Sequence, residues 1–332
     1  MAEQPRIGVL GGGSWATAIM KMLSSNLDRV HWWMRNEDAI EHIRTTGHNP
    51  NYIQSVQFDN NRIVVTSDMQ RVVDNCDVLV VAIPSAFLDA SFKEYKIQGM
   101  ENKVLFSAIK GIVNEYHSIP ARYLHKEFRT PYDQIGIICG PCHAEEVAKE
   151  QLSYLTIACP NQEHASLLAN AMRTRYIKTA VSEDVFGAEI AAVLKNVYAV
   201  AAGICHGVGY GDNFQAVLIS NAIREMERFI SAVNEVHRDV KETPYLGDLL
   251  VTAYSPYSRN RTFGTMVGKG YSVKWATIEM NMVAEGYYAS EGIFEMNKKF
   301  QVHMPIADAV YRILYERISP VVEMKILADN LD

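Results

Sequence analysis

The sequence lacks a strong excess of either charge, internal repeats and low-complexity segments. Its formal net charge is −6 over 332 residues, which gives no reason to expect nucleic acid or an acidic membrane surface as a partner. No N-terminal segment has the order of a signal peptide, and the longest apolar stretch, 190–205, is short for a bilayer span and contains Lys195. Five cysteines without an export signal predict reduced thiols in a cytoplasmic protein that is not stably inserted in a membrane.

Near the N-terminus, a short apolar run passes through glycines into a run that favours a helix. Ile7 to Leu10 is followed by three glycines and then by the helix-compatible residues 16–23. The spacing Gly11-x-Gly13-x-x-Ala16 fits the dinucleotide-binding fingerprint, in which glycines permit a tight turn and the close approach of a pyrophosphate. The N–H groups at the helix start would then face the phosphates. A glycine-rich turn that binds nothing is the alternative.

Further apolar runs end at Gly, Pro or Ser, or pass into polar residues, and they predict a doubly wound sheet. Such runs are typical of strands buried on both faces of a parallel sheet. We expect strands over 29–33, 62–66, 78–83, 104–109, 135–139 and 155–158, and a helix over 163–174. Ligands of such sheets lie beyond the carboxyl ends of the strands, where Pro84, Lys110 and Gly140 would be found.

After about residue 182 the pattern becomes mainly helical. Helical patterns cover 184–205, 213–233, 272–300 and 306–315, and the chain is long enough for two domains. We therefore predict an α/β protein with an N-terminal Rossmann-like doubly wound domain over 1–181. A mainly α-helical C-terminal domain for substrate binding and catalysis is expected over 182–332.

The end of the second expected strand bears on the choice of dinucleotide. An NAD-preferring site usually has Asp or Glu there for the ribose 2′-hydroxyl. This sequence has Arg35 and no acid before Glu37, and an arginine can receive the 2′-phosphate of NADP. NAD(H) and NADP(H) are therefore both candidate cofactors, and a solvated loop arginine is the alternative for Arg35.

Cys139-Gly-Pro-Cys142-His143 has the spacing of a redox dithiol and of a haem-attachment motif. However, the chain shows no export signal for haem attachment, no second C-x-x-C for zinc and no tryptophan directly before Cys139. We favour a loop at a strand end over a redox or metal role, and we expect no metal site.

Lys195 lies in a segment, 189–203, that carries few other charges. Small residues at 188, 192, 199 and 203 recur at helical spacing, which predicts close packing against another element. Burial there would lower the pKa of the lysine and make it a usable general acid/base. A lysine on a narrow polar stripe that reaches water is the alternative.

Ser258-Arg259-Asn260-Arg261 combines two guanidinium groups with an amide and a hydroxyl. Guanidinium groups pair bidentately with phosphate or carboxylate, so this run is a candidate anion receptor, with a solvated basic loop as the alternative. Asp248 supplies a carboxylate upstream, although a single aspartate in such a place is often an N-cap or turn residue.

Taken together, the chain resembles the bacterial-type NAD(P)-dependent glycerol-3-phosphate dehydrogenases from about residue 5 to 325. The specific blocks are VFGAEIAAVLKNVYAVAAGI at 185–204 and SRNRTFG at 258–264. The other blocks are GGGSWATA (11–18), VVAIPS (80–85), SAIKGI (107–112), GPCHAEEVA (140–148), GDLLVT (247–252) and VAEG (283–286).

The resemblance implies a role for each matching residue. Lys195 would be the proton acceptor on the C2 oxygen of glycerol 3-phosphate. Lys110 would be a second catalytic residue and would stabilise the charge that develops on that oxygen. Implied dinucleotide contacts are Gly11, Gly13, Ser14, Trp15, Arg35, Lys110, Ala144, Arg259, Val283 and Glu285. Implied substrate contacts are Lys110, Gly140, Cys142, Lys195, Asp248, Ser258, Arg259 and Asn260, with Arg259 and Asn260 on the phosphate. Cys142 stands where the family commonly has Ser or Thr. Residues 242–246 differ from the glycine-rich stretch that precedes the GDLLVT block in the family.

The resemblance further implies an oxidoreductase that interconverts sn-glycerol 3-phosphate and dihydroxyacetone phosphate and supplies phospholipid synthesis, as a homodimer. A β-hydroxyacid or 6-phosphogluconate-type dehydrogenase is one alternative, against which Asp248 and the 258–260 block argue. A dinucleotide-binding regulator without catalysis is another, against which Lys110 and Lys195 argue.

Overall fold

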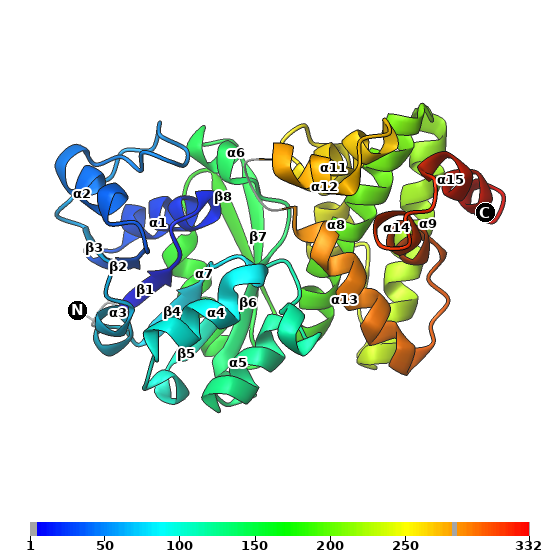
Figure 1. Cartoon of the computed structure of the whole chain (residues 1–332). Coiled ribbons are helices and arrows are strands. Elements are labelled where there is room, and N and C mark those ends of the chain that lie inside the picture. The colour runs from blue at the N-terminus through cyan, green and yellow to red at the C-terminus, as the bar shows by residue number, and fades with distance from the viewer. Residues whose placement is uncertain (1–4, 281–283, 332) are drawn as a thin grey trace. The chain divides into compact units, whose positions relative to one another are not determined.

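The computed structural model describes residues 5–280 and 284–331, which belong to two compact units (Figure 1). The first unit holds the residues up to 109 together with 120–185, and the second holds 110–119 together with the residues from 186 onward. The structure therefore differs from a division at 181/182, because residues 182–185 belong to the first unit and the segment 110–119 belongs to the second. This segment belongs with the helices because Ile112 and Ile119 are buried in the helical core.

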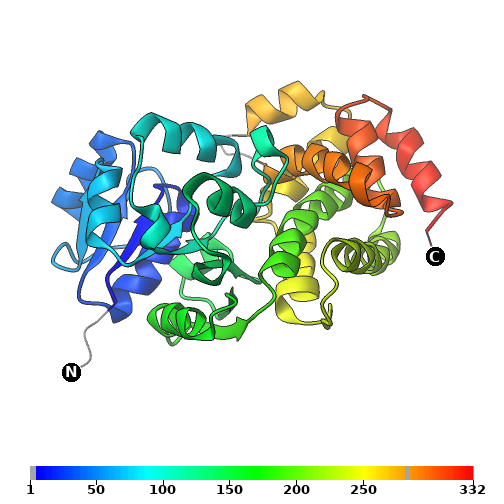
Figure 2. The same cartoon turned by 90° about the horizontal axis from the view of Figure 1, so that it is seen from below.

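The first unit is built on a sheet with the strand order β3-β2-β1-β4-β5-β6-β7-β8. Neighbouring strands are parallel except β6 and β7, which are antiparallel. All residues of β1 and β4 are buried, and helices lie on both sides of the strands (Figure 2). The doubly wound α/β prediction is confirmed. The strands are β1 (Ile7–Leu10), β2 (Val30–Trp33), β3 (Ile63–Thr66), β4 (Val78–Val81), β5 (Val104–Ser107), β6 (Ile135–Cys139), β7 (Ser153–Ala158) and β8 (Ile177–Ser182).

Side-chain caps fix several helix starts in this unit. Asn36 accepts a hydrogen bond from the Ala39 N–H at the start of α2, and Gly47 ends that helix with φ 77°. The helices are α1 (Ser14–Asn26), α2 (Glu37–Thr46), α3 (Met69–Asn75), α4 (Ser85–Tyr95), α5 (Pro120–Phe128), α6 (Ala144–Ala148) and α7 (Gln162–Met172), with 3₁₀ turns η1 (Met100–Asn102) and η3 (Tyr132–Gln134).

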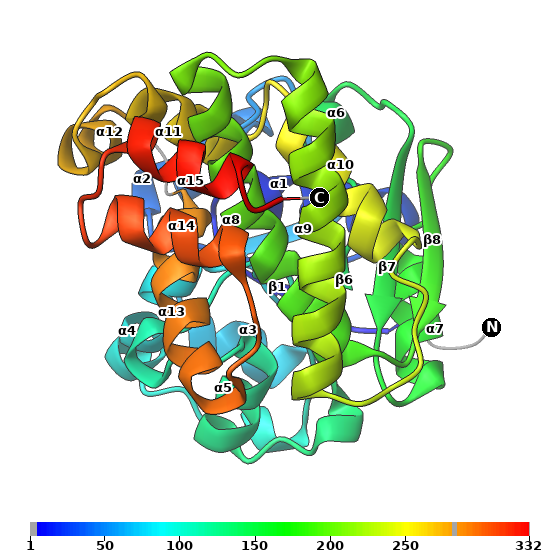
Figure 3. The ribbon, with the colours of Figure 1, turned by 90° about the vertical axis from the view of Figure 1, so that its right-hand side faces the viewer.

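The second unit is helical and is built around α8 (Figure 3). By length and composition α8 could cross a membrane, but 94% of its most apolar window is buried inside the protein, so its apolar side chains form a core. The elements are η2 (Asn114–Tyr116), α8 (Val185–Val208), α9 (Asp212–Val233), η4 (Thr243–Gly247, a π turn), α10 (Asp248–Tyr254), α11 (Arg259–Gly268), α12 (Val273–Glu279), α13 (Glu285–Phe300), α14 (Pro305–Leu314) and α15 (Pro320–Ala328).

Two predictions of elements were wrong. The sheet does not end at 155–158, because β8 adds an edge strand parallel to β7. A single helix over 272–300 is not formed, because Met280 takes an extended conformation and ends α12, while α13 starts at Glu285.

Glycines bring α8 and α11 into direct backbone contact. A Cβ at Gly203 would collide with the carbonyl oxygen of Arg261, and one at Gly264 would collide with that of Val200. The close packing predicted from the small residues of α8 is therefore present at Gly203. It places the start of α11 beside the helix that carries Lys195.

A buried carboxylate joins α9 to α14. Glu225 accepts hydrogen bonds from the N–H groups of Ile306 (2.8 Å) and Ala307 (3.0 Å), which belong to the first turn of α14. These groups have no acceptor inside their own helix, so Glu225 caps α14 from a distant part of the chain. Burial raises the pKa of Glu225 to about 7.

Candidate functional site

In the first unit, the glycine run turns the chain from β1 into α1. Gly11 has φ +140°, and a Cβ there would lie 2.5 Å from the Ala82 carbonyl oxygen, so this position requires glycine. Gly13 is the N-cap of α1, offers no side-chain cap, and has open space where a Cβ would stand. Gly13 therefore places no side chain over the start of α1, where the first-turn N–H groups of a helix can bind a phosphate. These residues fit the pyrophosphate of a dinucleotide.

Two side chains that the sequence analysis missed hold this turn in place. The buried Trp32 indole donates to the Gly11 carbonyl oxygen (2.7 Å). The buried Asn49 amide donates to the Thr17 hydroxyl (2.9 Å) and to the Gly12 carbonyl oxygen (3.3 Å). Asn49 lies in an irregular polar segment, where no local pattern distinguishes it from other loop residues.

Arg35 follows β2 at the same edge of the sheet as the glycine turn. The Gly11 N–H donates to the Trp33 carbonyl oxygen (3.0 Å), and a Cβ at Gly12 would touch the Met34 side chain. Arg35 comes next in the chain and is exposed. Trp15 lies partly buried in the first turn of α1.

The C-x-x-C stretch is a loop between β6 and α6. Cys139 ends the strand, Gly140 turns the chain with φ +108°, and Ala144 begins the short helix. Cys139 and Cys142 are both buried thiols. Within residues 5–280 and 284–331, no group of three or more His, Cys, Asp or Glu side chains could hold a metal ion.

In the second unit, Lys195 is a buried lysine in the middle of α8. Its side chain is 4% exposed, and its ammonium donates to the Thr252 hydroxyl (3.0 Å) and to Asp248 Oδ1. Burial lowers its pKa from 10.5 to about 7, and the charge of Lys110 acts in the same direction while Asp248 opposes it. The interpretation as a desolvated lysine is confirmed over that of a lysine that reaches water.

Asp248 joins two lysines that are distant in the sequence. It is the first residue of α10, its side chain is 1% exposed, and Oδ2 accepts from Lys110 Nζ (3.3 Å) while Oδ1 accepts from Lys195. Burial opposes its charge, but the two ammonium groups and their hydrogen bonds hold the pKa of Asp248 below its usual value. Lys110 is 18% exposed and is therefore the more accessible of the two cations.

A chain of amides fixes the segments around this pair. Asn196 donates to the Lys110 carbonyl oxygen (2.5 Å) and accepts from the Asn260 amide (2.9 Å). Asn260 in turn accepts from the Gly286 N–H at the start of α13 (2.9 Å). Residues from four separate segments are thereby held at one place in the helical unit.

The remaining predicted residues of this unit lie at helix starts. Ser258 caps α11 by accepting from the Arg261 N–H, Arg259 follows it half-buried, and Glu285 begins α13. Val283 lies outside the described residues. Sequence reasoning missed Thr252 and Asn196; Thr252 stands four residues after Asp248, so helical spacing could have placed both on one face.

A dinucleotide-type turn in a doubly wound unit and a buried lysine–carboxylate pair in a helical unit define the class of two-domain NAD(P)-dependent dehydrogenases. Residues 6–165 match the family described as NAD-dependent glycerol-3-phosphate dehydrogenase N-terminus, and residues 184–325 match its C-terminus. The chain belongs to the NAD-dependent glycerol-3-phosphate dehydrogenase family.

Individual relatives are similar in sequence to this chain over nearly its whole length. The chain is 35% identical to a Salinibacter ruber protein named glycerol-3-phosphate dehydrogenase (NAD(P)+) 2, over 95% of this chain and 91% of the relative. It is 32% identical to a Staphylococcus aureus protein named glycerol-3-phosphate dehydrogenase (NAD(P)+), over 95% of each. A solved glycerol-3-phosphate dehydrogenase structure from Coxiella burnetii superimposes with a TM-score of 0.89 at 25% identity, covering 98% of both chains.

Proposed function

We propose that this protein interconverts sn-glycerol 3-phosphate and dihydroxyacetone phosphate with NAD(H) or NADP(H), using Lys195 as the acid/base. The observation that carries this proposal is the buried cluster of Lys195, Asp248 and Lys110 in a member of this dehydrogenase family. When bound, the dinucleotide supplies the chemistry of hydride transfer at C2 of the substrate.

The residues of the cluster account for the proton. With its pKa near 7, Lys195 is present both as an amine, which can take the proton of the C2 hydroxyl, and as an ammonium, which can return it to the carbonyl oxygen. Asp248 orients the ammonium and compensates its charge. Lys110, less buried and held by the same carboxylate, would stabilise negative charge that develops on the C2 oxygen.

The remaining implied roles belong to the same proposal. The dinucleotide would contact Gly11, Gly13, Ser14, Trp15, Arg35, Lys110, Ala144, Arg259, Val283 and Glu285. The substrate would contact Lys110, Gly140, Cys142, Lys195, Asp248, Ser258, Arg259 and Asn260. Supply of phospholipid synthesis, a cytoplasmic location and a homodimer are proposed from the family resemblance, and light scattering of the purified protein tests the last of these.

The decisive experiment measures oxidation of NADH and of NADPH with dihydroxyacetone phosphate as acceptor. We expect turnover with at least one dinucleotide, and loss of about 100-fold or more in kcat for Lys195→Ala, because a positioned acid/base contributes about 10²- to 10⁴-fold. Dinucleotide binding by this variant should stay within a few-fold of the wild type. Unchanged turnover of Lys195→Ala would refute the assigned role.

Arg259 provides the test of the phosphate site. A hydrogen bond to a charged group is worth about 1.5–3 kcal/mol, so Arg259→Ala should raise KM for dihydroxyacetone phosphate by about 10- to 100-fold. The KM of an unphosphorylated analogue, dihydroxyacetone, should not change in the same variant. If both values rise equally, the phosphate is bound elsewhere.

A further inference from the structure

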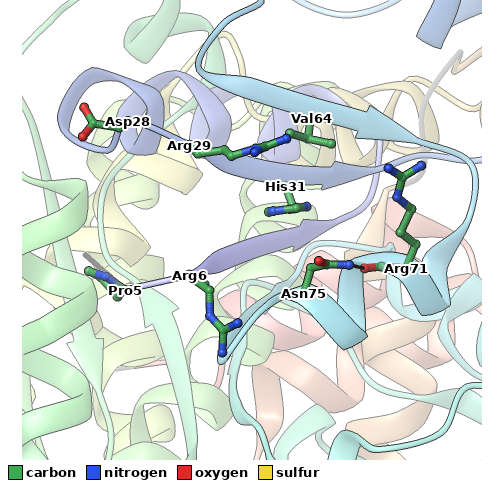
Figure 4. A pocket seen from close by; sticks show the side chains of 8 residues that line it. All are labelled: Pro5, Arg6, Asp28, Arg29, His31, Val64, Arg71 and Asn75. Carbon is green, nitrogen blue, oxygen red and sulfur yellow. Dashed lines mark hydrogen bonds between the residues drawn. The ribbon is translucent and has the colours of Figure 1, made fainter. Parts of the chain in front are cut away.

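The first unit contains a cavity at the amino ends of β1 and β2, the sheet edge opposite to the glycine turn (Figure 4). Its volume is about 330 Å³, which is at the lower end of the range for small-molecule sites, about 300–1,000 Å³. On β1, Arg6 precedes the strand and Gly11 follows it, so the cavity is separate from the dinucleotide turn. The lining residues are Pro5, Arg6, Asp28, Arg29, His31, Val64, Arg71 and Asn75.

Strand register explains why the cavity exists. Gly8, His31 and Val64 are paired neighbours on β1, β2 and β3, and a Cβ at Gly8 would touch Val72 of α3. The helix therefore lies close to the sheet at Gly8. His31 and Val64 remain half-exposed, although the other residues of their strands are buried.

Three arginines line this space, and two of them make no ion pair within the described residues. Arg6 makes an ion pair with Asp77, with Nε 2.8 Å from Oδ2. The guanidinium groups of Arg29 and Arg71 are exposed, and neither has an ion-pair partner in the part of the chain that the structure describes. Figure 4 shows the Asp28 carboxylate directed away from His31.

The pKa of His31 reflects the same excess of positive charge. Burial lowers the pKa of His31, and the charges of Arg29, Arg71 and Arg6 lower it further. The ring is therefore neutral at neutral pH and can offer one N–H donor. An anion beside it would act in the opposite direction and favour the imidazolium.

We propose that this cavity binds a small phosphate-bearing anion, held by the guanidinium groups of Arg29 and Arg71 with the imidazole of His31 as a further donor. A phosphate group carries up to two negative charges and three terminal oxygens, so it can pair bidentately with both guanidinium groups, whereas a carboxylate brings one charge to two cations. The volume also leaves room for the carbon part of a phosphomonoester. The site is independent of the proposed catalytic role of Lys195.

The test follows the ring protons of His31 by NMR in the full-length protein, with the resonance assigned from His31→Asn. The pH midpoint of His31 is measured in chloride alone and with inorganic phosphate at equal ionic strength. We expect phosphate to raise the midpoint by about one pH unit, because an opposite charge within hydrogen-bonding range favours the charged ring. Phosphate bound in the helical unit would not produce this local change.

Matched variants decide whether the arginines are responsible. In Arg29→Gln/Arg71→Gln the midpoint without phosphate should rise, because two like charges are lost, and the additional effect of phosphate should disappear. Arg224→Gln, which removes an exposed arginine from α9, should behave like the wild type. A phosphate effect that is absent in the wild type, or that persists in the double variant, would overturn the proposal.

A second titration distinguishes a phosphomonoester from free inorganic phosphate as the ligand of the cavity. Ribose 5-phosphate, a phosphomonoester, is titrated in the same way as inorganic phosphate. A midpoint shift at lower concentrations of ribose 5-phosphate assigns the cavity to phosphomonoesters, and a shift at lower concentrations of inorganic phosphate assigns it to the free ion. Absence of any shift with both ligands would refute the site.

Discussion

The pKa of Lys195 gives the catalytic proposal a sharp test, because the two reaction directions need opposite protonation states. Oxidation of glycerol 3-phosphate requires the amine, so kcat/KM should rise with pH and level off above about 7. Reduction of dihydroxyacetone phosphate requires the ammonium, so kcat/KM should be highest below about 7 and fall as pH rises. Initial rates at 340 nm between pH 5 and 9, at constant ionic strength, measure both profiles.

The magnitude of the effect follows from burial. Lowering the pKa of Lys195 from 10.5 to about 7 corresponds to about 5 kcal/mol between its two protonation states. At pH 7, about half of the Lys195 side chains are then amines, whereas an ordinary lysine would have a fraction of about 3 × 10⁻⁴. The helical core therefore raises the concentration of the working base by about 1,500-fold.

Two substitutions should move the Lys195 midpoint of the kcat/KM pH profiles in opposite directions. Asp248→Asn removes the carboxylate that favours the ammonium, so the Lys195 midpoint should fall by about 1–3 pH units. Lys110→Met removes a like charge, so the midpoint should rise. Both variants should have a lower maximal kcat/KM. The pH at which the profile is half-maximal is read independently of that maximum, so the shift can still be measured.

The exposed substitution Arg224→Gln serves as the control and should leave both profiles unchanged. Midpoints that stay in place in Asp248→Asn and Lys110→Met, or that move in the same direction in both, would refute the assignment. So would profiles of identical shape in the two reaction directions.

Three further predictions concern other parts of the molecule. Between pH 4.5 and 7 the native state holds a proton on Glu225 that the unfolded chain has lost, so the stability from this group falls as pH rises. Relative to wild type, Glu225→Gln should gain about 3 kcal/mol in unfolding free energy between pH 4.5 and 8; a constant difference in urea unfolding would contradict this. Gly203→Ala should cost about 1–3 kcal/mol in the same assay, because its methyl group meets the Arg261 carbonyl, and a loss below about 0.5 kcal/mol would show that the contact relaxes. Arg35→Ala should raise KM for NADPH at least 10-fold more than KM for NADH, and equal changes would remove Arg35 from the 2′-phosphate site.

Much of the sheet could be predicted from local composition because its central strands are buried on both faces. The apolar runs that form β1, β4, β5 and β6 therefore stand out in the sequence. β8 is an edge strand with several exposed residues, including Lys178, so hydrophobicity alone does not reveal it. The end of α12 at Met280 has no glycine or proline to mark it.

The site shows the same division between local and long-range information. That Lys195 lies in an apolar, small-residue helix was predictable, although the same pattern also fits a lysine that reaches water along a polar stripe. Its partners were not, since Asp248 and Lys110 reach it only through the packing of α10 and of the segment 110–119. The contacts of Asn196 and Asn260 likewise exist only after these segments have come together.

The membership of residues 110–119 in the helical unit has a consequence for how such proteins can be recombined. A gene fragment that begins at residue 186 would lack Lys110 and also Ile112 and Ile119, two side chains of its own core. One crossover between two relatives therefore cannot exchange their helical units intact. An exchange of whole units needs junctions at 109/110, 119/120 and 185/186.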